Sequence, residues 1–315
     1  MSPSLRPSEF TNDVAKAVNS IRLRLLGRSL PPALYHYTSF DAVLKIGDSR
    51  VLRATSCTDL DDAKEIEYGA ELVQEQVQRK LKSGVAEFPK MVLRLLPATV
   101  IDSKRWTFVA CFCTAADSGF HRKDYGKYSL EFDTRSSRDP QLRPRGLDAD
   151  VQYYRAIYWP CVQRWAIRRA VNSIAAPAAK NSSVAMKGPW AESLARFCAQ
   201  NASQLLMDLV ASFKASRFRR EKEWRIVCRP CLALNSSAPG LERERFRHLI
   251  KGDHKHCVEL QTPAPARGLI MSARSGSAVP FCSIYRPDGF RSHDDEFLRI
   301  RKMLEENDRR DIKLG

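Results

Sequence analysis

The sequence has no long hydrophobic run and no recognisable export signal. No uninterrupted apolar stretch approaches the roughly 18 residues that a transmembrane helix needs, which excludes an integral membrane protein built from such helices. The first ten residues, MSPSLRPSEF, contain neither an apolar segment nor a small-residue cleavage site. We therefore expect a cytoplasmic protein that does not bind a membrane.

Several common signatures of enzymes are also absent. The sequence contains no GxGxxG, no GxxxxGK[ST], no GxSxG and no HExxH. These absences remove the commonest dinucleotide, P-loop, serine hydrolase and zinc protease signatures. An active site must therefore come from residues in a less familiar pattern.

The chain is well supplied with core-forming residues and positive charge. Of its 315 residues, 43% are hydrophobic, which is enough for one large domain or two modest ones. It carries 52 Lys and Arg against 36 Asp and Glu, and the resulting net charge of +16 favours an acidic partner, which nucleic acid, a dinucleotide or an anionic lipid surface would satisfy. Nine cysteines, an odd number scattered from Cys57 to Cys282, are expected to be free and mostly buried thiols.

The hydrophobic pattern predicts helices and strands that arrive in groups. Helical spacing of apolar residues predicts helices over 11–26, 40–47, 59–83, 88–96, 161–180, 190–215 and 294–306. Runs of β-branched and aromatic residues predict strands over 34–39, 106–113, 127–133, 151–159, 223–229, 267–272 and 281–285. We expect the strands between 106 and 159 to pair in one sheet. Because strands arrive in clusters without regular βαβ alternation, the pattern favours an α+β fold with a mixed or largely antiparallel sheet.

Residues 35–39, YHYTS, form the first candidate site. In a strand, His36 and Thr38 point to one face, and Tyr35 and Tyr37 point to the other. A histidine beside a hydroxyl can hydrogen-bond the diol of a ribose. The alternative is a half-buried edge strand whose histidine makes a structural hydrogen bond, and these residues alone do not exclude it.

The second candidate site contains two glutamates, Glu221 and Glu223, in the sequence RREKEWR. We expect both to open a strand, which would point the two carboxylates in the same direction. Such a pair can divide a reaction, because one carboxylate can stabilise positive charge on a sugar carbon while the other orients or deprotonates an acceptor. The alternative is a solvated charged face in which Trp224 and Arg225 serve packing and solubility.

The cysteine and histidine pattern contains one further motif. Cys228 and Cys231 have C-x-x-C spacing, but a strand leads directly into Cys228, whereas a thioredoxin-like site needs a helix N-terminus there. Adding His254, His256 and Cys257 gives a conceivable zinc set with an unfamiliar gap between its halves. We therefore expect no metal site.

Three other residues are expected to be structural or solvated. Cys111 and Cys113 share one face of a predicted strand and are most simply core sulfur. His121 lies in a predicted turn with Lys123 and Asp124, and we expect it to be solvated.

A basic stretch, 214–229, is interleaved with Phe218 and Trp224 and preceded by Phe213. Arginine and lysine among aromatic rings suit phosphate contact combined with base stacking. An ordinary helix-to-strand junction with outward charges is an equally good explanation. In the first case the stretch would bring an acidic acceptor to Glu221 and Glu223.

Five segments together resemble a bacterial domain-of-unknown-function family that is similar to divergent ADP-ribosyltransferases. In chain order they are YHYTS, the acidic DLDDAKEIE, CFCT, DYGKYSLEFD and REKEWRIV, and the resemblance covers roughly residues 33–290. It implies a split, mixed or antiparallel sheet with flanking helices and an NAD-binding cleft. We accordingly expect an N-terminal helical extension over 1–30 and a single domain over 31–315, with a helical insertion around 161–215.

The resemblance also implies roles for individual residues. Glu223 is the expected catalytic carboxylate at the nicotinamide ribose, and Glu221 the carboxylate on the acceptor side. Arg225 is implied as a phosphate or structural partner, and His36 as the anchor of a ribose hydroxyl. The residues expected at the NAD site are His36, Tyr37, Thr38, Tyr125 and Arg225.

The predicted function is therefore mono-ADP-ribosyl transfer that consumes NAD, in a bacterial toxin or phage-defence effector with an antitoxin or neighbouring-gene partner. Cleavage of an N-glycosidic bond to a cationic leaving group passes through an oxocarbenium-like state, which a fixed carboxylate stabilises. The net charge favours nucleic acid, DNA or RNA, as the acceptor over a protein side chain. The alternatives are a non-enzymatic nucleic-acid-binding protein on the same scaffold and an NAD glycohydrolase.

Overall fold

The computed structural model divides the chain into two compact units. It describes residues 7–26, 30–49, 51–60, 63–115, 121, 125–126, 128–134, 143–144, 149–180, 189–230, 250–252, 255–261 and 284–285. Unit 1 comprises Met1–Ser29, Thr55–Val109 and Tyr154–Arg219, and unit 2 comprises Leu30–Ala54, Ala110–Tyr153 and Arg220–Gly315. The predicted strand 267–272 and the predicted helix 294–306 lie outside the described residues.

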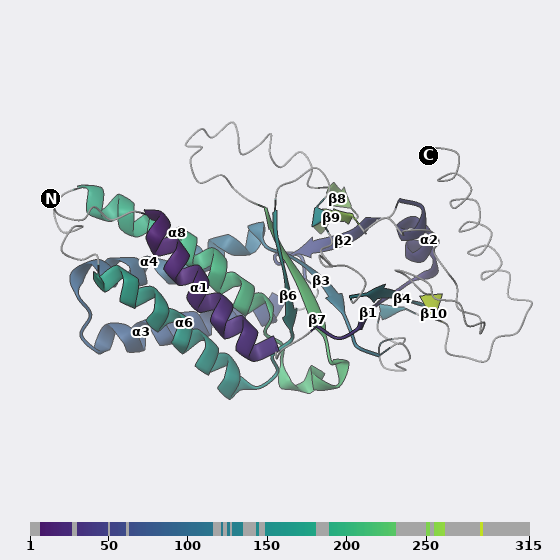
Figure 1. Ribbon diagram of the computed structural model, residues 1–315, viewed down its shortest axis with the longest axis horizontal. Helices are drawn as coiled ribbons and strands as arrows, with labels where there is room; N and C mark the ends of the chain where they lie inside the picture. Colours follow the sequence, from purple (N-terminus) through teal and green to yellow (C-terminus); the bar gives the residue numbers. More distant parts are fainter. Residues whose placement is uncertain are drawn as a thin grey trace, which may run out of the picture. The chain divides into compact units, whose positions relative to one another are not determined.

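Unit 1 is a helical bundle. Its long helices pack side by side (Figure 1) and are α1 (Pro7–Leu26), α3 (Ala63–Lys82), α4 (Glu87–Ser103), α6 (Pro160–Lys180) and α8 (Pro189–Ala211). Each buries one apolar stripe, as the fully buried Val14, Val18 and Ile21 on α1 illustrate. The helix predicted over 88–96 is longer than expected, since α4 continues through Pro97.

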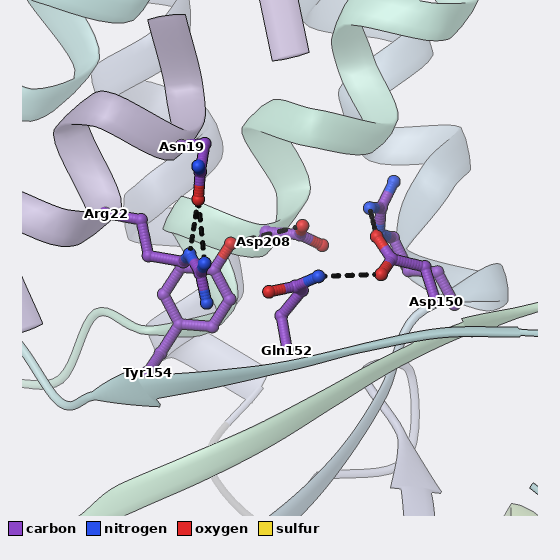
Figure 2. A network of polar contacts seen from close by, with 7 residues as sticks. Asn19, Arg22, Asp150, Gln152, Tyr154 and Asp208 are labelled. Carbon is purple, nitrogen blue, oxygen red and sulfur yellow. Dashed lines mark hydrogen bonds and ion pairs between the residues drawn. The ribbon is translucent and has the colours of Figure 1, made fainter. Parts of the chain in front are cut away.

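Close helix approach and buried polar contacts fix the packing of unit 1. Gly69 on α3 lies so near α8 that a Cβ there would meet a methyl carbon of Val210 at 2.5 Å. The Tyr154 hydroxyl donates a hydrogen bond of 3.2 Å to buried Asp208 on α8 (Figure 2), and the Arg22 guanidinium lies 6.0 Å from the centroid of the Tyr154 ring. Tyr154 therefore contacts both α1 and α8, through its ring and through its hydroxyl.

Unit 2 contains a three-stranded antiparallel sheet of order β1-β4-β10, formed by β1 (Ala33–Thr38), β4 (Tyr128–Asp133) and β10 (Ile284–Tyr285). The register places His36 opposite Leu130 and Thr38 opposite Tyr128. Helix α2 (Phe40–Ser49) follows β1 directly and packs on β4. Leu34 and Leu130 are buried and supply the apolar face on which this sheet depends.

A second sheet has the order β5-β9-β2-β3-β7-β6, with β8 paired to β9, and most of its residues belong to unit 2. Its strands are β2 (Val51–Ser56), β3 (Phe108–Phe112), β5 (Arg143–Pro144), β6 (Ala149–Arg155), β7 (Trp224–Pro230), β8 (Ile250–Gly252) and β9 (Lys255–Gln261). The pairings β2–β3, β5–β9 and β8–β9 are antiparallel. The expectation that 106–113, 127–133 and 151–159 share one sheet is wrong, because β4 pairs with β1 instead.

The fold class is α+β, with antiparallel strand pairs and separate helices, as the clustered strands predict. Two short 3-10 helices, η1 (Lys104–Trp106) and η2 (Ser216–Glu221), connect helices to strands. None of the described helices is long and apolar enough to cross a membrane.

Candidate active site

One pocket in unit 2 collects most of the residues that the sequence singles out. It has a cavity volume of about 70 Å³ and is lined by Tyr35, His36, Tyr37, Cys111, Phe112, Cys113, His121, Tyr125, Glu221 and Glu223. That volume is well below the roughly 300–1,000 Å³ of sites for drug-sized ligands, so the pocket suits one ring or sugar of a larger ligand. Five of the seven predicted site residues share this pocket, and Thr38 and Arg225 are not among its lining residues.

Backbone pairing holds the β1 wall of the pocket in place. Tyr35 and Cys113 exchange two backbone hydrogen bonds of 2.9 and 2.8 Å just beyond the end of β3. These bonds place consecutive residues of β1 against Cys111 and Phe112, while β4 pairs along β1 as well. Three consecutive residues of β1 line the pocket, which simple alternation of strand faces does not predict.

His36 is fixed from two sides. Its Nδ1 lies 2.9 Å from the backbone carbonyl oxygen of Cys111, and its ring packs at 5.6 Å against Phe112. A carbonyl oxygen only accepts, so Nδ1 carries the hydrogen. This is the structural hydrogen bond of the alternative interpretation, yet it leaves the acceptor Nε2 of the neutral ring without a hydrogen-bond partner among the described residues.

Burial lowers the pKa of His36 below its ordinary value of 6.5, and the hydrogen bond to Cys111 opposes that shift. The ring is therefore neutral at pH 7 in the Nδ1–H form. Because the unfolded chain binds a proton more readily than the folded chain, the free energy of unfolding falls as the pH drops below 6.5, until the pH is below the lowered pKa of folded His36.

Replacing His36 with asparagine should make stability less sensitive to acid, because asparagine has no proton to gain. We expect the free energy of unfolding in urea to fall less between about pH 7.5 and about pH 5 for His36→Asn than for the wild type. An equal fall in both proteins would contradict the lowered pKa of His36.

Both glutamates are buried, so their interpretation as a solvated charged face is wrong. Glu221 is 2% exposed and Glu223 is 4% exposed. The expectation that both lie in a strand is also wrong. Glu221 ends η2, Lys222 has a positive φ of 47°, and β7 begins only at Trp224. A left-handed lysine is uncommon and breaks the two-residue period of a strand, so a turn brings both glutamates to the pocket.

Arg225 holds Glu223. Its Nε lies 2.6 Å from Oε1 of Glu223, and the arginine itself is 3% exposed. A charge-assisted hydrogen bond of this length between two buried groups orients the carboxylate. Arg225 therefore positions Glu223 and does not itself line the pocket.

The pKa of the Cys113 thiol reflects the electrostatics of the pocket. Burial, together with the negative charges of Glu223 and Glu221, raises the pKa of its thiol to about 11, against a backbone hydrogen bond at Ala115 that lowers it. A thiol with this pKa is protonated at pH 7 and is a poor nucleophile. The same two charges make the pocket favourable for a cationic group.

His121 is a pocket residue that the sequence does not reveal. It is 6% exposed rather than solvated, and its ring stacks on Tyr37 with centroids 5.1 Å apart and planes 21° apart. Tyr125 continues this aromatic wall at 5.9 Å from His121, and the Tyr37 hydroxyl donates to the Ala115 carbonyl. Cys111 and Cys113 likewise line the pocket instead of serving only as core sulfur.

Gly126 allows the aromatic wall to approach β1. Its φ is 128°, and a Cβ there would lie 2.3 Å from the backbone oxygen of Thr38. Only glycine fits this contact. The backbone of Thr38 therefore packs against Gly126 and helps to position Tyr125, the residue before Gly126. Thr38 does not itself line the pocket.

The remaining sequence motifs have mixed outcomes. Cys231 and His254 lie outside the described residues, and the described part of the chain contains no group of three or more metal-binding side chains. In the basic stretch, Phe213, Lys214 and Trp224 are buried, whereas Arg217 and Arg219 are exposed.

No protein-family model, curated protein or solved structure matches the chain.

Proposed function

We propose that the chain is an NAD-consuming mono-ADP-ribosyltransferase whose pocket receives the nicotinamide end of NAD. The observation that carries this proposal is the meeting of His36 with Glu221 and Glu223, which are far apart in the sequence, in one pocket with an aromatic wall. Two buried carboxylates, a neutral histidine and stacked rings are the groups that a cationic aromatic base on a ribose requires.

Glu223 has the surroundings of an electrostatic catalyst. In the reaction the bond between C1′ of the ribose and the pyridinium nitrogen breaks, and its electron pair goes to nicotinamide, which leaves as a neutral molecule. Positive charge then develops on the ribose carbon. A buried carboxylate held by Arg225 stabilises that charge without reorganising at the moment of reaction.

Glu221 has the position of a general base in this scheme. It accepts the proton of the acceptor hydroxyl or amine as the acceptor forms a new bond to C1′, so the products are nicotinamide, ADP-ribosylated acceptor and one proton. Its burial beside the pocket places it within the same site as Glu223. With water as the acceptor, the same residues would give an NAD glycohydrolase.

The other pocket residues would bind and orient the substrate. The Nε2 of neutral His36 can accept a hydrogen bond from a ribose hydroxyl, because Nδ1 already donates to Cys111. The stacked rings of Tyr37, His121 and Tyr125 offer a flat surface for nicotinamide. An activity of this kind would serve a toxin or a phage-defence effector.

The purified protein should release nicotinamide from NAD, and the release should depend on an added acceptor. The assay compares buffer alone with added total RNA, DNA or cell lysate, and the products are separated to detect modified acceptor. Release only with an additive would support transfer, whereas equal release in buffer would identify the glycohydrolase.

NAD should also stabilise the folded protein. At a hundredfold excess over its Kd it should stabilise the wild type by about 2.7 kcal/mol and so raise the melting temperature, and it should stabilise His36→Ala much less. No release and no thermal shift would contradict the proposal.

A further inference from the structure

A second feature of the protein, in unit 1, is an exposed tryptophan with an arginine over its ring. Trp159 precedes α6 and is 51% exposed. The guanidinium carbon of Arg219 lies 4.8 Å from the centroid of its ring, a cation–π geometry. An exposed ring paired with a cation is a common element of surfaces that bind nucleic acid bases.

A second aromatic ring, that of Phe218, lies on η2, the 3-10 helix that also carries Arg219. Arg217 and Lys214 approach the ring of Phe218 to 4.7 and 5.1 Å. Arg217 and Arg219 are exposed, and Phe218 is partly exposed. We call Trp159, Arg217, Phe218 and Arg219 the Trp159 surface.

Backbone bonds join the two segments that carry this surface. The amide of Ile157 donates to the carbonyl of Ser212, and the amide of Lys214 donates to the carbonyl of Ile157. The buried side-chain amide of Gln163 donates to the carbonyls of Ile157 and Lys214, at 2.5 and 3.1 Å. Trp159 and η2 are therefore held in a fixed relation, so little ordering is needed when a ligand binds.

Helix α6, which begins directly after Trp159, also carries exposed arginines. Arg164, Arg168 and Arg169 are exposed within the first ten residues of the helix, a length of about 15 Å. Arg168 and Arg169 line a hollow with Trp165 and Asn172. Phosphates spaced along a strand would meet arginines here while bases meet rings.

We propose that the Trp159 surface binds single-stranded nucleic acid and that this nucleic acid is the acceptor of ADP-ribose. The acceptor role rests on the proposed function, whereas the binding does not. Exposed aromatic faces distinguish a single strand from a duplex, whose bases are already stacked, and from an acidic polypeptide, which has no base to stack. Arg217, Phe218 and Arg219 belong to the same 3-10 helix, η2, as Glu221, the proposed general base.

The first test is binding of fluorescein-labelled oligo(dT) and oligo(U) of about 15 nucleotides, measured by anisotropy without NAD. Trp159→Ala should weaken binding about 5- to 100-fold, the effect of losing one stacked base. Arg219→Ala should weaken binding and lower the slope of log Kd against log salt by about one. The matched controls are Trp190→Ala, which removes a tryptophan 83% exposed on α8, and Arg105→Ala, which removes the cation 5.2 Å from the Trp106 ring.

Binding that falls in the first two variants and not in the controls supports the Trp159 surface. Equal binding by all variants, equally tight binding of a duplex, or equal competition by polyglutamate would overturn it. Transfer of ADP-ribose to the oligonucleotide then separates the two proposals. Full transfer by Trp159→Ala would overturn the acceptor role and leave the proposed function standing. Binding without any nicotinamide release would contradict the proposed function and leave the single-strand surface standing.

Discussion

Replacing Glu223 with glutamine should reduce nicotinamide release from NAD by about 10²- to 10³-fold, the effect of removing one electrostatic stabiliser from an active site. Glutamine keeps the size and one oxygen that can accept from Arg225, but it has no charge to offer the ribose carbon. We expect kcat to fall more than KM changes, because the lost interaction is made with the transition state.

The control for this variant is Glu65→Gln. Glu65 is also buried, at 8% exposed, but it lies on α3 in unit 1. The control should keep the release rate of the wild type, and melting curves of both variants establish that they are folded at the assay temperature. A Glu223→Gln protein that is folded and releases nicotinamide at the wild-type rate would remove Glu223 from the mechanism.

Replacing Arg225 with methionine should lower the free energy of unfolding by about 3–5 kcal/mol. The substitution leaves the buried carboxylate of Glu223 without the guanidinium that now binds it at 2.6 Å, and a buried charge that has lost its counter-charge is costly. Urea denaturation followed by circular dichroism measures the change.

Two comparisons separate this effect from lost packing. Arg229 is four residues further along the chain, and its Nη2 contacts Asp150 at 2.5 Å, but the Asp150 side chain is 41% exposed. Arg229→Met should therefore lower the free energy of unfolding by only about 0–1 kcal/mol.

The double variant Glu223→Gln/Arg225→Met buries no unpaired charge from this pair and should regain most of the stability that Arg225→Met loses. Equal losses in Arg225→Met and Arg229→Met would show that the buried ion pair is not the cause.

The sequence predicts local structure in this protein better than it predicts pairing. Apolar residues at helical spacing identify the core of α1, α3, α6 and α8, and alternating aromatic residues identify β1 and β4. Strand partners depend on contacts between distant residues, so the pairing of β4 with β1 was not predictable from composition. β2 is not among the predicted strands, although Leu52, Ala54 and Ser56 alternate as buried residues directly after α2.

For the candidate site, too, the sequence predicts which residues belong to it better than it predicts how they are arranged. Residue types and spacing single out His36, Glu221 and Glu223, but alternating charges before Trp224 imitate the period of a strand. The positive φ of Lys222 that replaces this strand has no signature in the sequence. His121 lies among polar neighbours typical of a solvated turn, and only tertiary packing brings it onto Tyr37.

The most direct test of the account is a crystal structure of Glu223→Gln with NAD, since this variant should bind NAD without consuming it. We predict density for the nicotinamide ring against Tyr37, His121 and Tyr125, with a ribose hydroxyl within hydrogen-bond distance of His36 Nε2. NAD bound elsewhere, or a pocket that contains no NAD at concentrations where the wild type releases nicotinamide, would contradict the account.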